Sequence, residues 1–125
     1  MARVLLRVQS IAASTAVPST VGAAVGGAST TQQIPLTTEK VAVTAYVEYG
    51  VSATAGVDVK VYASADGVAW DTVPYQTISP ALTAGQPVQQ TAQVDCQGIA
   101  FIAVTANNKD AVVATRAIVV SISGL

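Results

Sequence analysis

The amino-acid sequence predicts an all-β protein, an antiparallel β-sandwich that is jelly-roll-like, with an N-terminal strand and an extended arm. Ala, Val and Thr make up 58 of the 125 residues, and β-branched residues favour strands. Apolar and polar residues alternate over several segments, and turn residues recur about every 8–12 residues, as in a sandwich. No segment has the periodicity of an amphipathic helix. An immunoglobulin-like sandwich is the alternative topology.

The N-terminal part of the chain carries two different patterns. It begins as a short alternating strand, with Val4, Leu6 and Val8 on one face. The following twenty residues are rich in Gly, Ala, Ser and Thr and lack large side chains that would anchor them to a core. We therefore expect an N-terminal strand and extended arm in residues 1–30 and a sandwich domain in residues 31–125. Another chain is expected to order the arm, because pairing with a neighbour's sheet edge needs no large side chains.

The later strands follow from alternation and from the turn residues between them. Strands are predicted at residues 32–37, 40–49, 57–64, 68–73, 75–79, 88–95, 99–106 and 112–123. Asp66-Gly67 is typical of a hairpin turn. Residues 99–106 are apolar on both faces, which predicts a central strand that is covered on both sides. Shared parity within these strands predicts a core made of Val41, Val43, Val47, Val59, Val61, Val94, Phe101, Ala103, Ile118 and Val120.

The composition argues against several classes of function. The sequence has no His, the commonest general base and metal ligand, and its single Cys cannot form an internal disulfide. Charged residues are 10% of the chain and the formal net charge is −1, so nothing favours binding to nucleic acid or to an anionic membrane. We expect a protein that is not an enzyme, with no catalytic residues, no cofactor and no metal. Arg7 and Gln9 interrupt the short apolar start, so it does not resemble a signal peptide, and synthesis in the cytoplasm is expected.

Each reactive residue type also has a plainer interpretation. Cys96 shares the parity of the inward-facing residues and has no His to activate it, so we interpret it as a small buried hydrophobe. Asp66 and Asp71, or the run at residues 107–110, would supply oxygens to a calcium site, but turn formation explains both groups. A Ser–Lys pair would suit a small hydrolase, yet the three lysines lie near predicted turns or on polar faces.

The candidate ligand platform consists of Tyr62, Trp70 and Tyr75. Aromatic rings stack on the apolar faces of sugars, so an exposed cluster of this kind is typical of carbohydrate sites. In the alternative interpretation, Trp70 fills one end of a core that is otherwise made of Val and Ala. The exposure of Trp70 distinguishes the two, because a buried ring excludes stacking with a sugar.

The segment from Val59 to Asp71 carries a resemblance to known proteins. A strand ends in Ser-x-Asp-Gly at Ser64–Gly67, and Trp70 follows three residues later. This hairpin resembles one found in galactose-binding-like jelly rolls and in small β-sandwich accessory proteins of tailed-bacteriophage particles. Together with the Val-, Thr- and Ala-rich terminal strand, residues 40–125 look like a head or tail accessory domain, such as a capsid decoration or cement protein.

The resemblance implies a non-enzymatic structural protein of the virion, synthesised and assembled in the host cytoplasm. It also implies contacts with other virion proteins such as the major capsid protein. Pairing of the arm with a neighbouring chain would make the protein a homo-oligomer, with a trimer as one form. A surface of Thr, Gln and Ser in place of charge fits this role, because burying it costs little desolvation. The alternative is a carbohydrate-binding or receptor-binding module of a tail or fibre.

Overall fold

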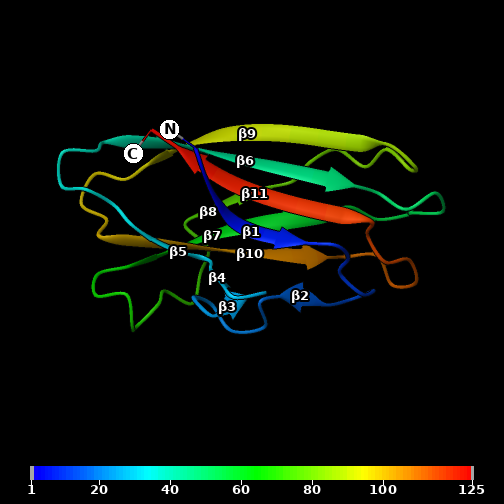
Figure 1. Ribbon diagram of the computed structural model, residues 1–125, viewed down its shortest axis with the longest axis horizontal. Helices are drawn as coiled ribbons and strands as arrows, with labels where there is room; N and C mark the ends of the chain where they lie inside the picture. Colours follow the sequence, from blue (N-terminus) through cyan, green and yellow to red (C-terminus); the bar gives the residue numbers. More distant parts are fainter. Residues whose placement is uncertain (1, 125) are drawn as a thin grey trace.

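The computed structural model describes residues 2–124, and all its regular structure is β. Two antiparallel sheets pack face to face (Figure 1). No helix in the described part of the chain is long and apolar enough to cross a membrane. The strands are β1 (Arg3–Val8), β2 (Ala16–Val17), β3 (Ala24–Val25), β4 (Ala28–Ser29), β5 (Thr31–Gln33), β6 (Lys40–Glu48), β7 (Val57–Ser64), β8 (Gln76–Ile78), β9 (Pro87–Asp95), β10 (Phe101–Asn108) and β11 (Ala117–Ser123).

The strand order is that of a jelly roll. The first sheet has the order β1-β11-β6-β9, and the second has the order β2-β10-β7-β8, with β5 also paired to β10. Each connection from β8 onward crosses from one sheet to the other, and the first strand pairs with the last. This is the double Greek-key arrangement of jelly rolls, so the fold prediction is confirmed and the immunoglobulin-like alternative is not needed.

The core lies between the sheets and consists of small aliphatic side chains. Alternation along β6, and along β7 as far as Ala63, sends every second residue inward, as the sequence predicts. Nine of the ten predicted core residues are at most 2% exposed. The largest fully buried side chain is Tyr49, whose hydroxyl donates to Pro80 O at 2.6 Å and accepts from Val57 N at 3.2 Å.

The prediction for Phe101 is wrong, because the inward parity of β10 is the opposite of the predicted one. Ile102, Val104 and Ala106 face the core, so Phe101 lies on the outer face, half-buried, with its ring against Gly67. Ala103 is fully buried but does not belong to the core cluster. As expected, β10 is covered on both sides, and for that reason its apolar pattern could not reveal which face is which.

The prediction that another chain orders residues 1–30 is also wrong. Within residues 2–124, β1 pairs with β11 of its own chain, and the two strands lie side by side (Figure 1). The register shifts between Val4 and Leu6, so Leu5 is an extra residue, and this bulge turns both Leu5 and Leu6 into the core. Val4, predicted to share a face with Leu6 and Val8, is 44% exposed. The first strand of the jelly roll therefore belongs to the sandwich itself.

The Gly-rich segment is ordered against the same sandwich. β2 and β5 pair with the two ends of one edge of β10, and residues 18–30 leave the sheet between them. There β3 and β4 form a small hairpin, in which Gly26 and Gly27 both have positive φ, at 59° and 82°. A two-residue turn with positive φ at both positions is the type I′ hairpin turn, for which Gly-Gly is a strong signal.

Two predicted strand segments are loops in the structure. Residues 68–73 form no strand, and their β-pairing is limited to an isolated bridge between Ser64 and Trp70. The terminal strand begins at Ala117, because residues 109–116 form a loop that is held by side-chain hydrogen bonds. The strand predicted at residues 32–37 is confirmed only at its start, because β5 ends at Gln33 and residues 34–37 form no strand. The other predicted strands are confirmed, although β8 extends only from Gln76 to Ile78.

Candidate functional site

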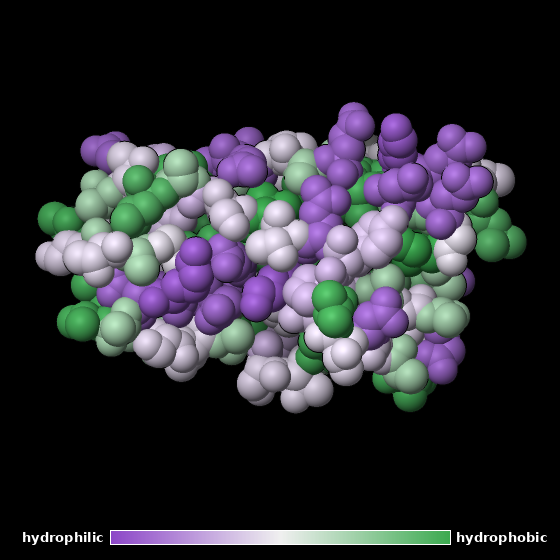
Figure 2. All heavy atoms as spheres, turned by 180° about the vertical axis from the view of Figure 1, so that it is seen from behind, coloured by the Kyte–Doolittle hydropathy of each residue, from purple (hydrophilic) through white to green (hydrophobic). Residues whose placement is uncertain are grey.

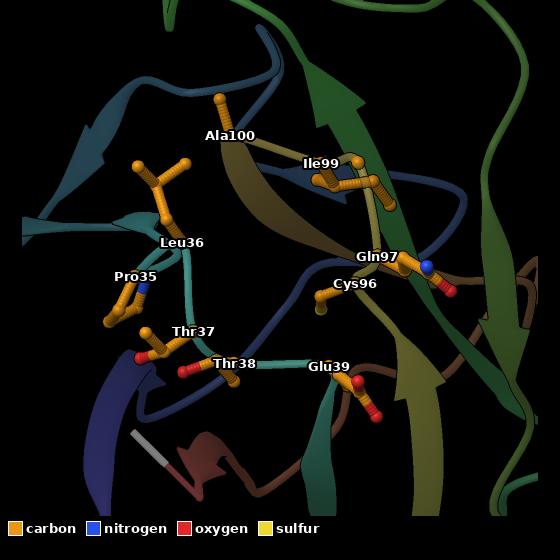
Figure 3. Close-up of a pocket in the computed structure, with 10 residues that line it drawn as sticks. Pro35, Leu36, Thr37, Thr38, Glu39, Cys96, Gln97, Ile99 and Ala100 are labelled. Carbon is orange, nitrogen blue, oxygen red and sulfur yellow. The ribbon is translucent and has the colours of Figure 1, made fainter.

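One end of the sandwich carries a groove between two loops. The loop at residues 35–39 forms one wall, and the turn at residues 96–100 forms the other (Figure 3). The groove has a volume of about 350 Å³, and Leu36 on its rim is fully exposed. Glu39 supplies its only ionisable carboxylate. The groove is therefore nearly neutral and suited to an apolar or uncharged polar group.

Cys96 lies at the base of this groove and is only 1% exposed. Its thiol donates weakly to Val94 O, with a sulfur-to-oxygen distance of 3.6 Å. Burial raises the pKa of the thiol, and the neighbouring charge of Asp95 raises it further. A neutral, enclosed thiol is a poor nucleophile, so the interpretation of Cys96 as a small buried hydrophobe is confirmed.

The three aromatic residues of the predicted platform do not line one common pocket. Tyr75 is 46% exposed and borders a second hollow of about 260 Å³, together with Ser64 and Asp71. Its hydroxyl donates to Asp95 O at 2.7 Å, which ties the ring to the end of β9. Neither Tyr62 nor Trp70 lines either hollow.

Trp70 is neither a free platform nor part of the central core. Its indole is half-buried, and a Cβ built on Gly22 would lie 2.8 Å from Nε1, so the ring packs against the Gly-rich segment. Tyr62 is half-buried on β7, opposite Ala103 of β10. Binding of a sugar to these rings stays a prediction.

The carboxylate of Asp66 is used by its own turn. Oδ1 accepts hydrogen bonds from Val68 N at 2.8 Å and from Ala69 N at 2.9 Å. These amides hold the pKa of Asp66 below its ordinary value. Ser64 Oγ completes the turn by donating to Ala69 O at 2.6 Å. The turn interpretation of Asp66-Gly67 is therefore confirmed.

The second oxygen-rich segment, at residues 107–110, also serves the backbone. Asp110 Oδ2 accepts from Thr54 N at 2.6 Å and Ala55 N at 3.1 Å, and Oδ1 accepts from Val112 N at 2.9 Å and Val113 N at 2.8 Å. These bonds lower the pKa of Asp110 strongly. Within residues 2–124, no group of three or more Cys, Asp and Glu residues is placed to hold a metal ion.

The opposite end of the sandwich gathers exposed aliphatic side chains. Val51 is 77% exposed, Leu82 41% and Val112 83%. Their loops adjoin one another, because Gly85 N donates to Gly50 O at 3.0 Å and a Cβ on Gly50 would meet the side chain of Val113. In Figure 2 this end of the molecule lies at the left, and hydrophobic residues are visible there as well as at the opposite end. Sequence reasoning missed this cluster, because its members lie in three separate loops without a shared periodicity.

Comparisons with known proteins support the fold. No family model and no curated protein matches the chain. Among solved structures, the chain is similar to the phage protein described as the PBSX exported protein XepA, with a TM-score of 0.61 and 14% sequence identity. The match covers 98% of this chain and 36% of that one, so this chain spans about a third of its structural neighbour. At this identity the likeness shows a shared fold.

Proposed function

We propose that the protein is a non-enzymatic structural subunit of a tailed-phage particle, and more narrowly a capsid decoration or cement protein. The observation that carries the proposal is the apolar character of its loops. Eight large hydrophobic residues are exposed among residues 2–124, and all but Val4 lie in loops between strands. Loops are normally polar, and clustered apolar residues at a surface mark contact sites.

Two further observations support this role. The fold neighbour is a phage protein, and jelly rolls recur in viral capsid proteins, although a shared fold is support by analogy. In addition, only 10% of the residues are charged, so covering the surface with neighbouring subunits costs little desolvation. In the proposed role the protein assembles in the host cytoplasm and contacts both copies of itself and the major capsid protein.

The first test of the proposal is fractionation of phage particles. Particles released by cells that encode the chain are banded by density, heads are separated from tails, and both fractions are analysed by quantitative mass spectrometry. A decoration protein is expected in the head fraction at a fixed ratio to the major capsid protein. Absence from banded particles would reject a virion role, and presence in tails alone would reject decoration.

A second test locates the contact surface. Particles that lack the protein are mixed with purified chain, and the bound fraction is measured after banding. The V51D/V112D variant places two charges in the apolar cluster at one end and is expected to bind less. V4D is the matched control, because Val4 is exposed on β1, away from the loop ends. Equal binding of V51D/V112D and wild type would show that this end makes no particle contact.

A further inference from the structure

β9 is the free edge of the first sheet. Among residues 2–124 it has a strand partner, β6, on one side only. Six of its nine residues are exposed. Gln90 is exposed even though its partner in the ladder, Ala45, is fully buried, because the facing strand β8 has only three residues. Within the described residues, part of β9 therefore has no strand of the second sheet opposite it, and the edge of β9 is accessible to solvent.

The register shows which backbone groups of β9 are unpaired by β6. Cys96 N donates to Glu39 O, which continues the β6–β9 ladder and marks that position as a hydrogen-bonded pair. Such pairs alternate along antiparallel strands, so the amides and carbonyls of Gln89, Thr91 and Gln93 point away from β6. Asp95 is the next residue whose backbone groups point away from β6, and its carbonyl accepts a hydrogen bond from the Tyr75 hydroxyl.

The sequence of this edge is close to a palindrome. Residues 88–94 read Val-Gln-Gln-Thr-Ala-Gln-Val and contain no charge. Edge strands usually carry a charged side chain, especially Lys, that opposes pairing with other chains. If the strand pairs antiparallel with itself about Thr91, then Val88 lies opposite Val94, Gln89 opposite Gln93, and Thr91 opposite its copy. Every facing pair at these positions then joins identical residue types.

We propose that β9 pairs with β9 of a second copy of this chain, antiparallel about a two-fold axis at Thr91. The two four-stranded sheets then become one continuous sheet of eight strands. The outward backbone groups of Gln89, Thr91 and Gln93 are satisfied in both copies, and the two-fold axis closes the assembly. The proposal concerns self-association only, so it stands or falls independently of a role in the virion.

Sedimentation equilibrium of the full chain tests the proposal, with three sequences compared. The wild type is expected to be a dimer. Q89K/Q93K places like charges directly opposite each other at two symmetric positions, and we expect about tenfold weaker association. Q89K/Q93E is the matched control, because the same register then places Lys opposite Glu at both positions. This variant is expected to dimerise as well as the wild type.

Thr91→Pro provides an independent variant in case added charge disturbs folding. Proline removes an amide that points outward, so the ladder with β6 is retained while the central intermolecular hydrogen bonds are lost. Far-UV circular dichroism checks that each variant is folded, and a folded monomer is expected for T91P. A monomeric wild type at all concentrations would overturn the proposal. So would undiminished association of Q89K/Q93K or of T91P, or equal loss in Q89K/Q93E and Q89K/Q93K.

Discussion

Asp110 joins two loops at one end of the sandwich through backbone amides. Its two carboxylate oxygens accept hydrogen bonds from residues 54–55 on one side and residues 112–113 on the other. Asn108 extends the same cluster, because its side-chain amide donates to Ile11 O at 3.1 Å and to Val113 O at 2.9 Å. The buried carboxylate of Asp110 thus joins residues 54–55 to residues 112–113, and Asn108 adds residue 11 to the same cluster.

We predict that Asp110→Asn destabilises the protein at neutral pH. Each oxygen of Asp110 accepts from two amides, so either orientation of the Asn side chain places its NH2 group against backbone N–H groups. The pKa of Asp110 is lowered by folding, so its contribution to stability is present above the unfolded value of about 3.9 and is lost as pH falls through the folded value. Urea unfolding across pH should show a wild-type advantage at pH 7 that shrinks below about pH 4. A constant difference would contradict this account.

Gly22 shows a different residue-scale constraint, imposed by an aromatic neighbour. Its φ is +85°, and an added Cβ would lie 2.8 Å from Trp70 Nε1. Gly27 has a similar φ of +82° but open space around it. We predict that Gly27→Ala costs about 1–2 kcal/mol from backbone strain alone, and that Gly22→Ala costs more because the indole must also move. Equal losses in urea unfolding would show that the Trp70 contact is unimportant.

At the scale of elements, the bulge in β1 decides which side chains face the core. Leu6 is fully buried and Val4 is 44% exposed, although both were predicted on one face. We predict that Leu6→Ala lowers the free energy of unfolding by about 2–5 kcal/mol, whereas Val4→Ala changes it by less than about 0.5 kcal/mol. Chemical denaturation measures both. A loss below about 1 kcal/mol for Leu6→Ala would mean that β1 contributes little to the sandwich.

Strands with one polar face could be located from the sequence almost to the residue. β6 alternates throughout and β7 does so as far as Ala63, because a one-residue slip in register would turn their apolar set to solvent. β10 is covered on both faces, so parity carried no information there and Phe101 was misplaced. In β1 a single extra residue reversed the parity halfway along the strand, and no local sequence signal marks that bulge.

Neither the groove nor the cluster of exposed aliphatic side chains at the opposite end could be predicted, because sequence periodicity again carries no information there. Each is made by loops that are distant in sequence, such as residues 35–39 and 96–100, and loops have no period from which orientation can be inferred. The three aromatic residues of the predicted platform are close in sequence, but their side chains do not meet at one place. A turn lies between Tyr62 and Trp70. The Trp70 ring packs against Gly22, whereas the Tyr75 hydroxyl donates to Asp95 O. Proximity along the chain was therefore a poor guide to a shared site.

At the scale of the whole molecule, the reactivity of the Cys96 thiol measures how readily the folded protein opens to solvent. The thiol is 1% exposed, and burial raises its pKa, so both access and the thiolate fraction are low in the folded protein. We predict negligible reaction with a thiol reagent in native buffer. Reactivity should increase with urea at the same midpoint as the loss of circular dichroism. Rapid labelling in native buffer would indicate local opening of the groove.

The pairing of β1 with β11 also determines when the protein completes its fold during synthesis. The partner of Val8 is Ile118, so the first strand leaves the ribosome long before its partner exists. At about 5–20 residues per second, translation of the intervening chain takes roughly 5–20 seconds. Throughout that interval Leu5 and Leu6 have no sheet edge on which to pack. Nascent chains of this protein are therefore expected to need a chaperone at the N-terminus until the last strand is made.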